Sequence, residues 1–252
     1  MENRILVSII TPTYNSVDFV SRTIDSVCNQ TYENWELLIV DDCSEDETVK
    51  FINEKYSSDK RIRVIRLEKN SGVGPARNLG IELCRGEFVA FLDSDDIWLE
   101  NKLEYQLGFM IKNNIPICCT SYFTNNRRKK LIRKVPESIS YYRILLDNCI
   151  GTSTVIYDKR SLDNLIFPDI RRRQDFILWL EYLREGDVIH GINIPLSEYT
   201  IRPQSLSFKK FRLIYWNWKV YKDFVKLSIF TCSLLVLKDI LIGVVRKINH
   251  SI

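Results

Sequence analysis

The first half of the chain alternates between short apolar runs and stretches with helical periodicity. The apolar runs lie at residues 5–10, 35–40, 61–67 and 88–92. They are rich in β-branched or aromatic residues, and three of them are nearly continuous, which is typical of strands buried on both faces of a parallel sheet. Only the run at 61–67 alternates, so we expect that strand to lie nearer an edge of the sheet.

Helical patterns separate the apolar runs. Their periodicity predicts four helices, at residues 17–28, 46–56, 75–84 and 99–111. We expect Asn15 or Ser16 to cap the first of them and Pro75 to open the third. Because strands and helices alternate, the pattern predicts right-handed βαβ units and an α/β fold with a mostly parallel central sheet.

The second half of the chain is less regular. Residues 116–122 and 153–157 resemble strands, and residues 141–146 resemble a short helix. A clearer amphipathic helix begins near Gln174, with Phe176 and Trp179 on its apolar side.

Composition agrees with a folded protein, because 45% of the 252 residues are hydrophobic and 27% are charged. The seven cysteines include no CxxC pair, so neither a zinc site nor a disulfide framework is indicated. The first apolar run spans only residues 5–10, which is too short for the core of a signal peptide. We therefore expect a cytoplasmic protein.

Charge is spread unevenly along the chain. From Ser205 to the last residue there are nine Lys and Arg against two acidic residues, a local charge of +7 within a total of +4. Aromatic residues interleave with these cations, and the apolar run that follows, 227–237, is too short to span a bilayer. The pattern predicts a basic amphipathic helical tail over 208–252 that lies on an anionic membrane face.

Two alternatives for this tail stay open, namely a helix packed on the catalytic core and a homodimer interface. Nucleic acid is the less favoured partner, because no RNA- or DNA-binding motif accompanies the basic residues.

Carboxylates end two of the predicted strands. Asp41 and Asp42 follow the second run, and Asp93, Asp95 and Asp96 follow the fourth. Ligands of open parallel sheets bind outside the carboxyl ends of the strands, so we expect these groups to face a common site. Neighbouring carboxylates repel one another, and Mg²⁺ or Mn²⁺ bridging to a substrate phosphate would relieve that repulsion. By spacing alone, a helix cap with solvated neighbours explains the segment equally well.

The glycine-containing segment 70–80 looks like a phosphate loop, but it lacks the Lys-Ser/Thr ending of a Walker motif. Its glycines also do not follow the first strand, as a dinucleotide fingerprint requires. A turn before a helix explains it.

Four segments together resemble the family 2 inverting glycosyltransferases of GT-A fold, of the type that assembles bacterial surface polysaccharides. They are Val7 to Asn15 (VSIITPTYN), Val40-Asp41-Asp42, Asn70 to Asn78 with its Ala-Arg-Asn ending, and Phe91 to Asp96 (FLDSDD). The resemblance covers residues 5–98 strongly and continues more weakly to about residue 207.

The resemblance implies roles for the matching positions. Asp41 would pair with the nucleobase, Thr11, Pro12 and Tyr14 would line the nucleotide pocket, and Arg77 would lie beside the base. Asp93 would bind ribose, Asp95 would hold Mn²⁺ or Mg²⁺ with the diphosphate, and Asp96 would approach the donor sugar. Residues 1–98 would form the nucleotide-sugar half and residues 99–207 the acceptor half of one domain.

In the second half, Asp175 matches the position of the family's general base, which would take the proton of an acceptor hydroxyl during a single in-line displacement. Its other interpretation is an acidic residue at a helix N-terminus. Arg202 is a candidate contact for the diphosphate or the acceptor. His190, after an apolar strand, is more typical of a structural residue than of a metal ligand.

We therefore expect transfer of a sugar from a nucleotide-sugar, a UDP-sugar by family frequency, to a hydroxyl of a lipid-linked glycan. A sugar nucleotidyltransferase and a non-catalytic nucleotide- or glycan-binding module are the alternatives. The former should carry a Gly-rich, Lys-containing loop after the first strand, where this chain has Thr11-Pro12-Thr13-Tyr14-Asn15.

Overall fold

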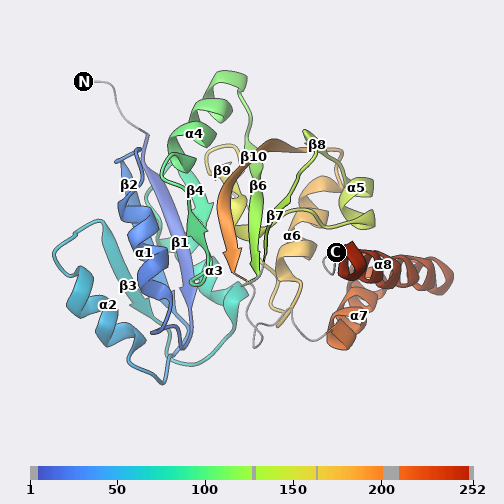
Figure 1. The fold of residues 1–252 in the computed structure, drawn as a ribbon, viewed down its shortest axis with the longest axis horizontal. Helices are drawn as coiled ribbons and strands as arrows, with labels where there is room; N and C mark the ends of the chain where they lie inside the picture. Colours follow the sequence, from blue (N-terminus) through green and yellow to red (C-terminus); the bar gives the residue numbers. More distant parts are fainter. Residues whose placement is uncertain (1–4, 127–128, 163, 201–209, 250–252) are drawn as a thin grey trace.

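A ten-stranded sheet forms the centre of the molecule in the computed structural model, which describes residues 5–126, 129–162, 164–200 and 210–249. The strand order is β3-β2-β1-β4-β9-β6-β10-β5, with β7 beside β6 and β8 beside β10. Helices cover both faces of this sheet (Figure 1).

The first four long strands are parallel, as the βαβ pattern predicts. They are β1 (Val7–Thr13), β2 (Trp35–Asp41), β3 (Ile62–Arg66) and β4 (Phe88–Phe91). The connections between them carry α1 (Val20–Cys28), α2 (Thr48–Tyr56) and α3 (Val73–Leu83). β3 lies at the edge of the sheet, with its first four residues half-buried and Arg66 exposed, which confirms the expectation for the alternating run.

The rest of the sheet is mixed. Its strands are β5 (Ile97–Trp98), β6 (Ile117–Asn126), β7 (Lys129–Arg133), β8 (Ser138–Ile139), β9 (Ile156–Asp158) and β10 (Ile189–Thr200). β9 runs antiparallel between β4 and β6, whereas β6 and β10 are parallel. One continuous sheet therefore joins the two predicted halves of the domain.

The remaining helical segments are α4 (Lys102–Asn113), α5 (Tyr141–Leu146), η1 (Thr152–Thr154), α6 (Gln174–Leu183), α7 (Lys210–Lys219), η2 (Val220–Phe224) and α8 (Ile229–Asn249). Here η1 is a single 3₁₀ turn and η2 a short π-helix. At the C-terminal side, α7 and α8 lie together beside α5 and α6 (Figure 1). Within the described ranges no helix has the length and apolarity needed to cross a bilayer.

Two hydrophobic clusters fill the two faces of the sheet. Successive residues of a strand point to opposite faces. Accordingly Ile9 belongs to the cluster under α1 and α4, whereas Ile10 belongs to the cluster that includes α6. The second cluster also takes in Val220, Tyr221 and Cys232, so the C-terminal helices are packed against the main body.

Three local predictions were wrong. α1 begins at Val20 and has no side-chain cap, because the Ser16 hydroxyl instead bonds the Tyr14 carbonyl and pairs with Ser94. α3 begins at Val73, so Pro75 is its third residue rather than its first. Residues 152–154 form a 3₁₀ turn, and the strand expected at 153–157 starts only at Ile156. In each case contacts between distant segments decide the local conformation.

Candidate active site

The predicted carboxylates of the first half lie at the carboxyl ends of the parallel strands. In the parallel register Thr13 is opposite Asp41, and the Leu92 N–H continues the ladder to the Ile10 carbonyl. A contact of 3.1 Å between the hydroxyls of Ser16 and Ser94 links the loop after β1 to the loop after β4. The segments that carry the predicted carboxylates therefore meet where the strands end, as expected for a ligand site of an open sheet.

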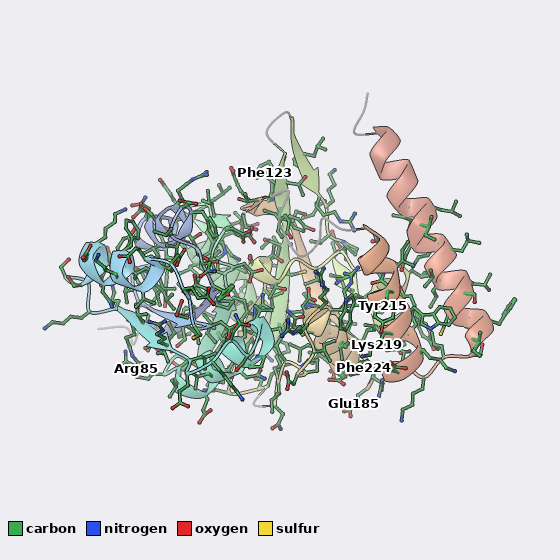
Figure 2. All side chains as sticks on the ribbon, turned by 90° about the horizontal axis from the view of Figure 1, so that it is seen from below. Arg85, Phe123, Glu185, Tyr215, Lys219 and Phe224 are labelled. Atoms are coloured by element: carbon green, nitrogen blue, oxygen red, sulfur yellow. The ribbon has the colours of Figure 1, made fainter. Side chains whose placement is uncertain are left out.

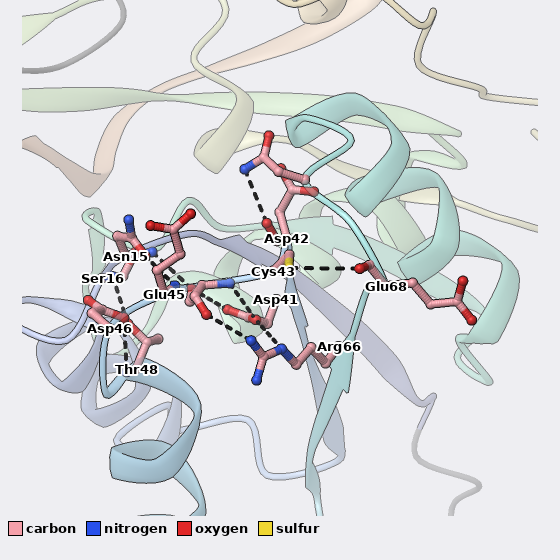
Figure 3. Close-up of polar contacts among 12 residues, drawn as sticks. Asn15, Ser16, Asp41, Asp42, Cys43, Glu45, Asp46, Thr48, Arg66 and Glu68 are labelled. Carbon is pink, nitrogen blue, oxygen red and sulfur yellow. Dashed lines mark hydrogen bonds and ion pairs between the residues drawn. The ribbon is translucent and has the colours of Figure 1, made fainter.

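Asp41 is completely buried at the end of β2. Its carboxylate accepts hydrogen bonds from the backbone N–H and the hydroxyl of Ser44, and the Arg66 guanidinium lies 3.6 Å away (Figure 3). The Ser44 hydroxyl also accepts from the Asn15 N–H, at 2.9 Å. Asn15 has a positive φ of 46°, which turns the chain sharply after β1. The loops after the first two strands are thus held together around Asp41.

Asp42 organises the segment that precedes α3. Its two carboxylate oxygens accept from the backbone N–H groups of Ser71, at 2.6 Å, and Gly72, at 2.8 Å. Gly72 has a φ of 97°, a conformation that favours glycine, and is the residue before α3. Asp42 therefore fixes the start of the helix that carries Arg77.

Arg77 and Asp93 form an ion pair. The Arg77 guanidinium donates to Asp93 at 2.5 Å, and the arginine is 3% exposed. The ring centroid of Phe167 lies 5.0 Å from the guanidinium carbon. Asn78 places Phe167 there, because its side-chain amide donates to the Phe167 carbonyl and accepts from the Phe167 N–H, both at 2.8 Å. Arg77 thus neutralises one of the three carboxylates after β4.

Asp96 is buried, at 1% exposure. Burial, together with the negative charges of Asp95 and Asp93, holds the pKa of Asp96 well above its usual range. Its carboxyl oxygens accept from the Ser153 hydroxyl at 2.5 Å and from the Thr200 N–H at 3.0 Å. Both oxygens are therefore occupied by protein donors.

Asp175 lies in the first turn of α6, on a different element from the other carboxylates, and is half-buried. The Thr152 hydroxyl donates to it over 3.3 Å. The next residue along η1, Ser153, contacts Asp96 and also accepts from the Asp93 N–H, at 3.1 Å. This one 3₁₀ turn therefore connects Asp175 with the acidic segment after β4.

Other predicted residues have different surroundings. Thr11 and Pro12 are buried within β1, whereas Tyr14 is 43% exposed beyond the end of that strand. His190 is the second residue of β10, and ten residues of extended chain, roughly 30 Å, separate it from Thr200. Arg202 lies outside the described residues.

Asp93, Asp95 and Asp96 supply the oxygen donors that Mg²⁺ and Mn²⁺ prefer. Burial, and after it the negative charges of Asp95 and Asp93, raises the pKa of Asp96. Among the described residues no three His, Cys, Asp or Glu side chains converge as a complete metal site. The donor set fits a hard cation that takes its remaining ligands from water and a diphosphate.

The sequence pattern predicted neither η1 nor the buried side chains that donate hydrogen bonds to its carbonyls. The Trp98 indole donates to the Ser153 carbonyl at 2.8 Å, and the Gln106 amide donates to the Thr154 carbonyl at 2.9 Å. The fully buried Lys102 ammonium donates to the same Thr154 carbonyl, at 3.3 Å, and to Gln106. Burial lowers the pKa of Lys102 to about 7. A lysine and a glutamine on the apolar side of the predicted helix 99–111 are the available signal.

Comparison with known proteins agrees with this geometry. The family model described as "Glycosyl transferase family 2" matches residues 8–162, more than half of the chain and including η1. The chain belongs to glycosyl transferase family 2. The match supports a glycosyltransferase, as the motifs predict, and does not favour the alternative of a sugar nucleotidyltransferase.

Two relatives from Escherichia coli are named as UDP-Glc:alpha-D-GlcNAc-diphosphoundecaprenol beta-1,3-glucosyltransferases. WfgD is 40% identical over 224 residues, which are 88% of this chain and 87% of that protein. WfaP is 35% identical over 210 residues, 82% of each.

The structure of Staphylococcus aureus TarS residues 1–349 in complex with UDP-GlcNAc superposes with a TM-score of 0.69 at 23% identity. The match covers 91% of this glycosyltransferase and 70% of that chain. At this identity the likeness shows the fold alone, and it confirms the expected GT-A architecture.

Proposed function

We propose that this glycosyltransferase moves a sugar from a UDP-sugar to a hydroxyl of a glycan carried on a lipid diphosphate, with inversion at the anomeric carbon. The observation that carries the proposal is η1, whose adjacent residues Thr152 and Ser153 contact Asp175 and the acidic segment after β4. A transferase needs its proton acceptor and its donor site within reach of one reacting carbon. The names of WfgD and WfaP support the choice of donor and acceptor.

For the nucleotide, the proposal assigns Asp41 to the nucleobase and Asp93 to ribose, with Arg77 beside the base and Tyr14 with Thr11 and Pro12 at the pocket wall. The exposure of Tyr14 next to the turn at Asn15 supports a role in contacting a ligand. Asp41 now bonds Ser44, so a base N–H would have to share or replace that donor.

Asp95 would hold Mn²⁺ or Mg²⁺ together with the donor diphosphate. When bound, the cation supplies positive charge to the departing diphosphate. Asp95 takes this role from the resemblance of the segment Phe91 to Asp96 to the family's acidic motif, whereas Asp93 is paired with Arg77 and Asp96 accepts two hydrogen bonds. Asp96, assigned to the donor sugar, must exchange one of its present donors for a sugar hydroxyl.

Asp175 is proposed as the general base. It stands at the start of α6, and the Thr152 hydroxyl orients its carboxylate. The carboxylate would take the proton of the acceptor hydroxyl as that oxygen attacks the anomeric carbon. Arg202 is proposed as a contact of the diphosphate or of the acceptor.

A lipid-linked acceptor places the reaction at the membrane surface. We propose a peripheral location on the inner face of the cell membrane, supported by the +7 charge that follows Ser205. A homodimer through the C-terminal helices is the competing arrangement.

The test is release of UDP from UDP-glucose by the purified full chain in the presence of Mn²⁺. We expect release to require a GlcNAc-diphospho-polyprenol acceptor and to yield a product heavier by one hexose, detected by mass spectrometry. The same acceptor without its terminal sugar is the control. UDP-sugar binding without any transfer, over a panel of donors and acceptors, would instead support the binding-module alternative.

A further inference from the structure

One side of α8 is apolar and exposed. Its exposed positions up to Leu241 are uncharged, and all are apolar except Thr231 and Ser233. We call the apolar ones the outer face of α8: Ile229, Phe230, Leu234, Leu237, Ile240 and Leu241, which are between 40% and 73% exposed. A surface helix of a soluble protein normally turns polar residues toward water. The outer face is thus a contiguous apolar stripe of the kind that marks an interaction surface.

The rotation of α8 is fixed by contacts on its inner side. Cys232 and Leu235 are buried in the hydrophobic cluster shared with α6. Asp239 accepts hydrogen bonds from the Tyr221 hydroxyl at 2.9 Å and from Asn217 at 2.7 Å. Lys238 donates to the Leu145 carbonyl at the end of α5, at 3.3 Å. Because these contacts hold the inner side, the outer face cannot turn into the protein.

We infer that the outer face of α8 lies on an anionic lipid bilayer, with the helix in the plane of the interface. This inference rests on the proposed function, since a lipid-linked acceptor brings the enzyme to a membrane. A helix whose apolar side inserts only into the headgroup boundary needs no spanning length.

Charge favours a bilayer over a second copy of the chain. Lys222 and Lys226 are exposed immediately before α8. The segment from Ser205 onward contains only two acidic residues, and one of them, Asp239, faces inward to Tyr221. The sequence from Ser205 onward carries a net charge of +7, which an anionic surface attracts and a second copy of the same segment repels.

The outer face is rigidly connected to the proposed base. The ring of Tyr221, which bonds α8 through Asp239, packs edge-on against Phe176 with a centroid distance of 6.2 Å. Phe176 directly follows Asp175 in α6. In the view of Figure 2, α8 stands at the edge of the molecule with side chains pointing away from the body, and Tyr215 and Phe224 lie between it and the sheet. A bilayer under α8 would therefore hold the membrane surface at a constant distance from Asp175.

Flotation with lipid vesicles tests the inference without any substrate. We expect the full chain to float with vesicles of phosphatidylcholine and phosphatidylglycerol and to float less with phosphatidylcholine alone. The double variant Phe230→Ser/Leu237→Ser should bind roughly 10- to 100-fold more weakly, because two large apolar side chains no longer enter the interface. The matched control is Tyr105→Ser/Ile111→Ser, which removes two exposed apolar side chains from α4 and should float like the parent.

A second variant covers the case in which the double variant misfolds. Lys222→Glu/Lys226→Glu changes only exposed side chains and should reduce the preference for phosphatidylglycerol. Equal flotation of the parent and both variants would overturn the inference, as would a dimer in light scattering that becomes a monomer when the outer face is changed. Vesicle binding by a protein that transfers no sugar would refute the proposed function and leave this inference standing.

Discussion

The three carboxylates after β4 differ in their surroundings although they are almost adjacent in sequence. Asp93 is paired with Arg77, and Asp96 is buried between Ser153 and Thr200. Asp175 comes from a different element, α6, and is contacted by Thr152. Under the proposed function, this division would let one site hold a nucleotide, a cation and a proton acceptor at the same time.

Replacing Asp175 by Asn removes the proposed proton acceptor but keeps the size of the side chain. We expect kcat to fall by roughly 10²- to 10⁴-fold, the usual contribution of a general base. UDP affinity, measured by calorimetry, should be unchanged. Asp169→Asn, an exposed position shortly before α6, is the control and should keep its activity. An Asp175→Asn enzyme with normal turnover would rule out this assignment.

Asp95→Asn should weaken UDP binding in the presence of Mn²⁺ by roughly 10- to 100-fold, because the cation loses a charged ligand. Binding in the presence of EDTA should be the same for the variant and the parent. Glu100→Gln, at an exposed position nearby, should leave the Mn²⁺ effect intact. Titration calorimetry measures both conditions. Unchanged affinity of Asp95→Asn in Mn²⁺ would contradict the metal role.

The buried Lys102 predicts a pH-dependent stability. The unfolded lysine has its usual pKa of 10.5, but the folded pKa is lowered to about 7 by burial. Burying the charged lysine therefore lowers the free energy of unfolding by its full amount below pH 7, and this destabilisation decreases as the pH rises toward 10.5. Stability relative to Lys102→Met should accordingly rise by on the order of 2 kcal/mol from about pH 7 to about pH 9.

Urea unfolding across this pH range measures the difference. Lys112→Met, on the same helix but exposed, is the control and should show a constant difference from the parent. A pH-independent difference for Lys102→Met would mean that the ammonium stays charged in the folded protein.

At the scale of elements, η1 is the connection that matters most. Its carbonyls accept hydrogen bonds from Trp98, Gln106 and Lys102. Its hydroxyls donate to the carboxylates of Asp175 and Asp96. The sequence predicts a strand at residues 153–157, because β-branched residues such as Thr, Val and Ile favour strands. Its actual conformation depends on donors that arrive from α4 and β5, which local propensity does not describe.

Ser153→Ala removes one of the two donors to the Asp96 carboxyl, leaving the Thr200 N–H, and removes the acceptor of the Asp93 N–H. We expect the free energy of unfolding to fall by about 1–3 kcal/mol. We also expect kcat to fall by roughly 10- to 100-fold, because the acidic segment shifts relative to Asp175. Ser153→Thr, which keeps the hydroxyl, should recover most of the turnover, and Ser138→Ala at an exposed position should change neither quantity. Loss of stability without loss of kcat would assign Ser153 a structural role only.

The elements of the first half follow the sequence pattern closely, since buried parallel strands leave continuous apolar runs that periodicity detects. The pattern was less informative for the second half. There the strands mix directions, and β9 inserts between β4 and β6 from a distant part of the chain. No local signal specifies that pairing.

At the scale of the whole molecule, the predicted halves are not independent. β4 pairs with β9, and the cluster under α1 continues into α4 and β6. A fragment of residues 1–98 would expose the parts of both sheet faces that α4 and α6 cover in the full chain. We expect it to show no cooperative thermal transition by circular dichroism, whereas the full chain should unfold cooperatively. A folded fragment that binds UDP would show that the nucleotide half is autonomous.

The sequence by itself determined the family, the parallel first half of the sheet and the carboxylates at its edge, because these depend on short motifs and on the period of buried strands. The tertiary structure decided what each carboxylate touches, how η1 joins Asp175 to the acidic segment, and which side of α8 faces outward. The reason is physical: burial and hydrogen-bond partners arise from contacts between residues far apart in the chain, and no local pattern contains them.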